Sequence, residues 1–386
     1  MIIRDATNKQ GHGIVMENEK NKLRVLHAAA LLRPLSGICT QMDWELDAAK
    51  ALGIEWKVKM YCPKNSTGNF CVMHFDTEVD AEKLSNLLSR LIGWIQLRYG
   101  YHQWLKKQED NIDIYLLRYH VHDPFQYWFV KRCKKPVYFV HHTLEVPELA
   151  LGGGISGWLK SSLESFIGKK TIPLARGIVG VTQEIVDYER GRAEEPEKES
   201  YVYPNGICYK EQNLQDRRGS VPELLFVANF APWHGLDRLL NAVEKSDQEF
   251  ILHLVGKVPN KLKDKISDSR IRVHGHLSNK KIAVLSEQCW VGLASFALDR
   301  KNMKQACPLK TREYLMLGLP VYGDHNDVFG AEFPYYKKGV CEITDIIDYG
   351  YRMRGTPKEA ISRYAKRFID KKNILSGLYK ALLASN

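Results

Sequence analysis

The chain has 386 residues, of which 44% are hydrophobic and 26% charged, and its formal net charge is +11. This composition is typical of a folded globular protein, and the length favours two domains over a single hydrophobic core. Because no apolar run could span a bilayer, no signal-peptide pattern opens the chain and no CxxC pair occurs among the eight cysteines, we expect a cytoplasmic protein with reduced thiols.

The first part of the chain predicts one alternating α/β domain. Residues 1–21 are polar and are expected to form a flexible extension, whereas residues 22–207 alternate strand and helix patterns. The expected elements are strands at 23–30, 55–62, 113–117 and 137–141, a strand and turn at 201–206, a helix at 40–52, and loops at 31–39 and 189–200. Such alternation indicates a parallel sheet with right-handed crossovers.

The net charge of +11 calls for an anionic partner. No nucleic-acid-binding module is recognisable, so charge alone is the argument for nucleic acid. Residues 84–107 interleave basic side chains with aromatic and aliphatic ones, which is typical of a helix lying on an anionic membrane. A packed surface helix is the alternative, and it is favoured by the interruptions at Gly93 and Gly100.

The second part predicts another alternating domain. Residues 208–220 have the composition of a linker, and residues 221–359 continue with strand and helix patterns. Residues 360–386 contain a basic helical stretch that is expected to cross back to the first domain. We therefore expect an α/β protein of two Rossmann-like, doubly wound domains that face a ligand-binding cleft.

The most informative stretch is 288–323. A buried strand at 290–296 and a polar loop at 299–306 precede a helix with Pro308 as its first residue. Glu313 lies one turn into this helix, and Lys310 adds a cation near its start. The free N–H groups of such a helix form an anion site. An ordinary crossover without a ligand is the alternative.

Five motifs together resemble the retaining nucleotide-sugar glycosyltransferases of the GT-B fold, glycosyltransferase family 4. They occur in the order and approximate spacing of that family: PNGI at 204–207, FVANFAPWHGLDRLLNAV at 226–243, HLVG at 253–256, IRVHGHL at 271–277 and PLKTREYLMLGLPV at 308–321. The resemblance covers about residues 22–330.

The resemblance implies a donor site. Glu313 would bind the ribose hydroxyls, and the backbone around Cys307, Leu309 and Lys310 would hold the diphosphate. Two departures stand out. Asn229 and His234 replace the Arg and Lys with which relatives contact the phosphates, and Gln305 stands where the family has the first Glu of its E-x7-E pattern.

The acceptor would lie on the first domain. Gly37, in a loop after the first strand, would approach the transferred sugar and phosphate closely. Arg118, His141, His142 and Glu145 follow strand ends and would align or deprotonate the acceptor hydroxyl, although such residues are often only structural. His120, His122 and Asp123 look like metal ligands, but enzymes of this fold usually hold the leaving diphosphate on helix dipoles and basic side chains. No metal or other cofactor is therefore expected.

The predicted function is retaining transfer of a sugar from a nucleotide-diphosphate donor to a glycan or lipid-linked saccharide, in bacterial synthesis of O-antigen, capsule or exopolysaccharide. The location would be the cytoplasm, at the inner face of the cytoplasmic membrane if residues 84–107 bind lipid. The predicted catalytic residues are Lys310, Glu313, His234, Arg118 and His142. A GT-B sugar-nucleotide epimerase, a non-catalytic nucleotide-binding scaffold and, from charge alone, a nucleic-acid-binding protein are the alternatives.

Overall fold

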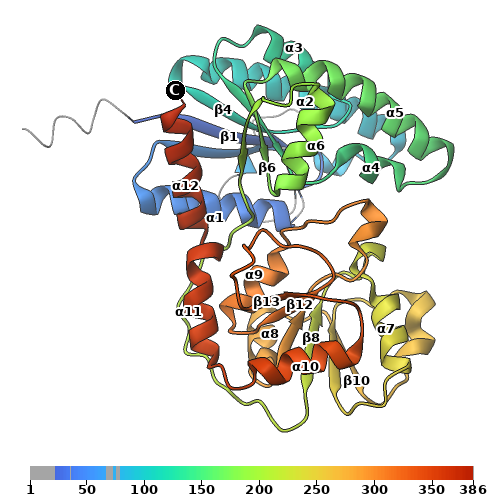
Figure 1. Ribbon diagram of the computed structural model, residues 1–386. Coiled ribbons are helices and arrows are strands. Elements are labelled where there is room, and N and C mark those ends of the chain that lie inside the picture. The colour runs from blue at the N-terminus through green and yellow to red at the C-terminus, as the bar shows by residue number, and fades with distance from the viewer. Residues whose placement is uncertain (1–21, 35, 67–72, 75–78, 386) are drawn as a thin grey trace, which may run out of the picture.

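The protein folds into two lobes, each built on a parallel sheet with helices on both faces (Figure 1). The computed structural model describes residues 22–34, 36–66, 73–74 and 79–385. The predicted extension at 1–21 lies outside this part of the chain. None of the helices described is both long and apolar enough to cross a bilayer.

The first lobe contains a seven-stranded sheet in the order β3-β2-β1-β4-β5-β6-β7, and all of its pairings are parallel. All six residues of β1 are buried, as expected for a central strand covered on both faces. The strands are β1 (Val25–Ala30), β2 (Trp56–Tyr61), β3 (Met73–His74), β4 (Ile114–Arg118), β5 (Val137–His141), β6 (Gly177–Gly180) and β7 (Glu199–Val202).

Six of the described helices before residue 200 flank this sheet. They are α1 (Ser36–Leu52), α2 (Leu87–Gln108), α3 (Pro124–Arg132), α4 (Glu145–Ala150), α5 (Gly154–Thr171) and α6 (Gln183–Ala193). Because α1 begins at Ser36, the predicted loop at 31–39 is wrong in its second half and Gly37 lies in the first helical turn. The reason is packing: Cys39 and Met42, three residues apart, are both buried in the lobe core, so the apolar face of the helix starts before residue 40.

One further expectation for this lobe is wrong. Residues 189–200 are not a loop throughout, because α6 continues to Ala193 and β7 begins at Glu199. The charged side chain of Glu189 is buried against Arg192, so tertiary ion pairs override the loop-like composition. Both interpretations of residues 84–107 predicted a helix, and α2 runs through Gly93 and Gly100; Gly93 is buried, and a Cβ there would lie 2.6 Å from Leu84.

The second lobe has a six-stranded sheet in the order β10-β9-β8-β11-β12-β13, again entirely parallel. Its strands are β8 (Glu223–Val227), β9 (Ile251–Val255), β10 (Ile271–Gly275), β11 (Val291–Leu293), β12 (Val321–Gly323) and β13 (Tyr336–Lys338), and its helices are α7 (Leu236–Glu244), α8 (Asn279–Ser286), α9 (Leu309–Met316), α10 (Ile343–Met353) and α11 (Lys358–Ile369). Two parallel sheets with flanking helices confirm the expected α/β fold class.

The last helix returns to the first lobe. After Asp370, α12 (Lys371–Ala384) packs along α1, as Figure 1 shows at the left of the molecule. Leu375, Leu378 and Leu382 belong to the core of the first lobe. The predicted stretch at 360–384 is thus two helices, α11 on the second lobe and α12 on the first.

Candidate functional site

Glu313 lies on α9 and lines a cavity shared by both lobes. The cavity, of about 130 Å³, is also lined by Trp44 of α1, Val227 of β8 and Ile282 of α8. Burial raises the pKa of the Glu313 carboxyl. Pro308 was predicted to be the first residue of this helix, and that prediction is wrong. It is the residue before the helix, because its ψ of 142° is extended. The carboxylate is therefore held one turn into a helix that begins at Leu309.

Lys310 carries a buried ammonium group. Its Nζ atom has no hydrogen-bond partner among the described residues and lies 4.5 Å from the centroid of the Phe226 ring. Burial lowers the pKa of this group from 10.5 to about 7. A cation that lacks a carboxylate partner is available to an anionic ligand.

His234 stands close to Lys310 and is held in one orientation. Its Nδ1 accepts the backbone N–H of Ala231 at 3.0 Å, so the proton of the neutral ring is on Nε2 and can be donated. Burial, together with the nearby charges of Lys310 and Lys301, lowers the pKa of His234 to about 3. The histidine is thus a neutral hydrogen-bond donor at pH 7. Asn229, two residues after β8, is exposed.

The turn after His234 depends on glycine. Gly235 has a φ of +72°, and a Cβ there would lie 2.7 Å from the backbone carbon of Phe296. The backbone after β8 therefore lies directly against the segment that follows β11. This close approach brings His234 and the loop before α9 to the same edge of the sheet.

The loop before α9 is tied to the first lobe. The Glu184 carboxylate accepts the backbone N–H groups of Lys304 and Gln305 at 2.7 to 2.9 Å, and the Gln305 side chain accepts the Glu184 N–H at 3.1 Å. Asn205 donates from Nδ2 to the Cys307 carbonyl at 2.7 Å. The side chain of Gln305 thus bonds to α6. Sequence reasoning missed Glu184 and the role of Asn205, although Asn205 belongs to the quoted motif PNGI.

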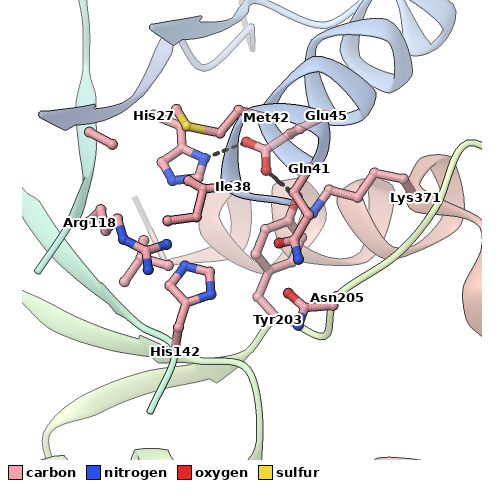
Figure 2. Close-up of a pocket in the computed structure, with 12 residues that line it drawn as sticks. His27, Ile38, Gln41, Met42, Glu45, Arg118, His142, Tyr203, Asn205 and Lys371 are labelled. Atoms are coloured by element: carbon pink, nitrogen blue, oxygen red, sulfur yellow. Dashed lines mark hydrogen bonds and ion pairs between the residues drawn. The ribbon is translucent and has the colours of Figure 1, made fainter. Parts of the chain in front are cut away.

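Arg118 and His142 point into a cavity of the first lobe (Figure 2). Burial lowers the pKa of Arg118 to about 10, and burial beside Arg118 lowers the pKa of His142 well below its usual range. Asn205 lines the same cavity and bonds to the loop before α9. The predicted acceptor residues Arg118 and His142 therefore lie next to the predicted diphosphate loop.

The floor of this cavity is a buried carboxylate. Glu45 accepts hydrogen bonds from His27 at 2.6 Å, Trp56 at 2.7 Å and Tyr203 at 2.9 Å, and it pairs with Lys371 of α12 at 3.3 Å. These partners hold the pKa of Glu45 well below its usual value despite its burial. Sequence reasoning missed this cluster, because its members are spread from residue 27 to residue 371.

His141 and Glu145 belong to a buried ion-pair network, and Glu145 also lines a cavity with Arg118 and His142. His141 bonds to Glu145 at 2.8 Å, and Arg192 lies 3.0 Å from Glu189 and 3.4 Å from Glu145. Burial, together with the neighbouring Glu145 carboxylate, raises the pKa of Glu189 well above its usual value. His141 and Glu145 therefore contribute to a structural ion-pair network. The Arg192 guanidinium lies among these carboxylates, and its positive charge disfavours binding of a metal cation by them.

The three metal-like residues do not converge on one point. Asp123 caps α3 by accepting the N–H groups of Phe125 and Gln126. His120 accepts the N–H of Ala30 at 3.1 Å, and the ring of His122 contacts the Lys160 carbonyl at 2.7 Å.

Gly37, which was predicted to approach the transferred sugar and phosphate, lies in the first turn of α1, with open space where a Cβ would stand.

Comparisons with known proteins identify the fold. No protein-family model and no curated protein sequence matches the chain. Among solved structures, the apo lipopolysaccharide outer core galactosyltransferase WaaB matches with a TM-score of 0.65 at 12% identity, over 94% of this chain and 100% of that one. A glycosyltransferase from Rickettsia africae matches with a TM-score of 0.62 at 14% identity, over 95% and 100% of the two chains. HepE from Anabaena, solved in complex with UDP, matches with a TM-score of 0.60 at 14% identity, over 94% and 100%. The architecture is therefore the GT-B fold of these enzymes.

Proposed function

We propose that the protein is a glycosyltransferase that moves a sugar from a nucleotide-diphosphate donor to an acceptor hydroxyl. The observation that carries the proposal is the Lys310 ammonium, which no described residue hydrogen-bonds, beside the Nε2–H donor of His234, with the Glu313 carboxylate one turn further along α9. Cationic and N–H groups suit a diphosphate, and a carboxylate suits the two ribose hydroxyls. The similar fold of HepE, which was solved with UDP and with UDP-glucose, supports a nucleotide in this place.

The proposed reaction is front-face transfer with retention, in the manner of glycosyltransferase family 4. The bond between the sugar C1 and the phosphate oxygen breaks, and its electron pair stays on the diphosphate. The acceptor oxygen bonds to C1 from the same face, and its proton passes to the departing phosphate oxygen. Lys310, His234 and the N–H groups at the start of α9 stabilise the diphosphate, so positioning and leaving-group electrostatics supply the catalysis without a divalent cation. Activity retained in excess EDTA supports the metal-free part of the proposal.

Arg118 and His142 are proposed to orient the acceptor. Both line the cavity that Asn205 connects to the diphosphate loop. The lowered pKa of His142 keeps its ring neutral at pH 7, so it can accept a hydrogen bond from a sugar hydroxyl or donate one to it.

The direct test of the proposed donor site is binding of UDP, GDP, ADP and CMP by thermal shift, followed by transfer from the matching nucleotide sugars. A selective shift that disappears in Glu313→Gln supports the donor site, and the absence of any shift contradicts it.

A sugar-nucleotide epimerase is the second candidate. A putative UDP-N-acetylglucosamine 2-epimerase from Listeria monocytogenes shares the fold with a TM-score of 0.52 at 10% identity, over 94% of this chain and 96% of that one. An epimerase needs no acceptor. Release of nucleoside diphosphate that rises on addition of a saccharide acceptor therefore favours the transferase, whereas epimerised donor without an acceptor favours the epimerase.

We further propose that the first lobe rests on an anionic membrane and that the acceptor is a lipid-linked saccharide of a bacterial surface polysaccharide. Two helices expose apolar side chains on their outer faces: Leu87, Leu88, Leu91, Ile92, Ile95 and Tyr99 on α2, and Ile155, Trp158, Leu159, Leu163 and Phe166 on α5. Within α2, α3 and α5 the single acidic residue, Glu164, is buried, whereas exposed lysines and arginines occur on all three. An apolar face edged with cations and free of exposed carboxylates suits anionic lipid at the inner face of the cytoplasmic membrane.

Vesicle sedimentation tests the membrane contact. The protein should pellet with vesicles that contain phosphatidylglycerol at low salt and less with neutral vesicles. The double variant Ile155→Ser, Trp158→Ser should pellet several-fold less. Val284→Ser, which removes a side chain that is 60% exposed on α8 of the second lobe, should pellet like the wild type. Equal pelleting of all three proteins would contradict the proposed face.

A further inference from the structure

Arg98, on α2, is a buried guanidinium with free donors. The residue is 8% exposed, and within the described part of the chain its Nε and Nη1 atoms are buried without a hydrogen-bond partner. An arginine in this condition opposes folding, since buried charged N–H groups lose their water and gain no acceptors in return. Such a group needs either a structural partner or a ligand.

The carboxylate nearest to Arg98 is already used. Asp123 Oδ2 lies 3.7 Å from Arg98 Nε, beyond hydrogen-bond distance. Its Oδ1 accepts the N–H groups of Phe125 and Gln126 at the start of α3, and its Oδ2 lies 3.3 Å from His102 Nε2. Asp123 therefore offsets part of the charge of Arg98 without satisfying its donors.

Arg98 lines a cavity together with a second arginine. The cavity has a volume of about 190 Å³, and Arg118, His120 and His142 also contribute to its wall. Burial, with the charges of Arg98 and Arg118, lowers the pKa of His120 well below its usual range, and burial with the charge of Arg118 does the same for His142. Burial, with a smaller effect of Arg98, also lowers the pKa of Arg118. Arg98 and Arg118 thus line the same cavity. Figure 2 shows the Arg118 side chain, at the end of β4, directed toward His142.

The single carboxylate in the cavity wall does not cancel this charge. Glu145 accepts from His141 at 2.8 Å and from Arg192 at 3.4 Å, in the ion-pair network described above. Burial lowers the pKa of Arg118 to about 10, the charge of Glu145 offsets part of this effect, and the guanidinium stays protonated at pH 7. The cavity therefore presents two cations and the free N–H donors of Arg98.

We propose that this cavity binds a phosphate group of the acceptor, held between Arg98 and Arg118. Guanidinium groups form paired N–H···O bonds with phosphate oxygens, and a tetrahedral oxyanion can accept from both forks at once. A volume of about 190 Å³ would hold about six waters at roughly 30 Å³ each, which is enough for a phosphate and a few remaining waters. The acceptor class is accordingly a phosphate-bearing saccharide.

The position on α2 agrees with a lipid-linked acceptor. Leu91, Ile92 and Ile95 are exposed near the start of this helix, and Arg98, seven residues after Leu91, is buried on nearly the same side of the helix two turns further along. A phosphate on Arg98 would then lie roughly 10 Å along the helix axis from the proposed bilayer contact at Leu91. Assignment of the phosphate to the acceptor rests on the transferase function proposed above, whereas binding of an oxyanion to the two arginines does not.

Phosphorus-31 NMR titration with inorganic phosphate at low salt tests the site. We expect the dissociation constant to rise at least 10-fold in Arg98→Gln and in Arg118→Gln, and to rise less in Arg98→Lys, which keeps the charge but loses the paired geometry. Lys310→Met is the matched control, because it removes a cation from the donor site alone. Near-ultraviolet circular dichroism checks that each variant is folded, and Arg118→Gln, at a less buried position, keeps the test valid if Arg98→Gln unfolds.

The outcomes separate the two proposals. Equal phosphate affinity in the wild type and both glutamine variants, or a loss confined to Lys310→Met, would overturn the phosphate site. Acetate that binds as tightly as phosphate would overturn the choice of phosphate over a carboxylate. Phosphate binding that depends on both arginines, in a protein that transfers no sugar from any nucleotide donor, would support the cavity and remove the transferase proposal.

Discussion

Replacing Lys310 with Met should stabilise the protein while it weakens donor binding. Methionine retains most of the methylene packing and removes the buried charge. The ammonium lacks a hydrogen-bond partner among the described residues, and its pKa falls from 10.5 to about 7 through burial. Because the pKa is lower in the folded protein than in the unfolded chain, the charge opposes folding most strongly below pH 7, and this opposition fades as the pH rises to 10.5.

The size of the effect follows from the same values. A fall from 10.5 to about 7 corresponds to about 5 kcal/mol at pH 6, at 1.36 kcal/mol for each pKa unit. The ring of Phe226, 4.5 Å from Nζ, returns up to about 2 kcal/mol through the cation–π interaction. We therefore expect Lys310→Met to raise the free energy of unfolding by about 3 kcal/mol at pH 6 and by less than about 1 kcal/mol at pH 10.

Urea denaturation followed by tryptophan fluorescence at the two pH values measures this difference. The control is Lys280→Met, at an exposed position of α8, for which the change should be small at both pH values. The same Lys310→Met protein should bind nucleoside diphosphate at least 10-fold more weakly. A variant that is destabilised equally at pH 6 and pH 10 would refute the reasoning, because Lys310 would then contribute favourable contacts and not an uncompensated charge.

Three further predictions concern other positions. Glu313→Gln should raise the dissociation constant of the preferred nucleotide about 10- to 100-fold in calorimetric titration, whereas Glu359→Gln, exposed on α11, should not. Gly235→Ala should lower the urea midpoint, since φ is +72° and the space for a Cβ is filled; Gly191→Ala, in a helix with open space, should leave it unchanged or raise it. Glu45→Gln should cost about 3 to 5 kcal/mol at pH 7. That loss should shrink as the pH falls below 4.5, because the lowered pKa of Glu45 stabilises the fold above this value.

The sequence was sufficient for the fold class and for predicting that the residues of the proposed donor site meet at one edge of a sheet. Strand patterns are local, and parallel strands end at one edge of a sheet, so Lys310 and Glu313 could be placed near His234 before any coordinates. The ends of elements were less predictable. Helix α1 starts at Ser36 because Cys39 is buried in the core, a tertiary fact that the polar residues around it conceal.

The sites that escaped prediction depend on contacts between distant residues. Arg98 appeared in the sequence as one basic residue of a surface helix, and only the packing of α2 shows that it is buried beside Arg118. Gln305 appeared as a missing acid of the donor site, whereas its side chain bonds to Glu184, 121 positions away. No local pattern encodes such pairs, because charge composition does not tell which side of a helix packs inward.

The return of α12 to the first lobe constrains the order in which a newly made chain can fold. The core of the first lobe includes Leu375, Leu378 and Leu382, and the cation that pairs with Glu45 is Lys371. During synthesis these residues leave the ribosome after every strand of the second lobe. The second lobe can therefore fold first. Until α12 is synthesised, the core of the first lobe is incomplete and Glu45 lacks its partner Lys371. This interval is when chaperones have most to protect, and a nascent chain arrested before residue 371 should expose its first lobe to proteases.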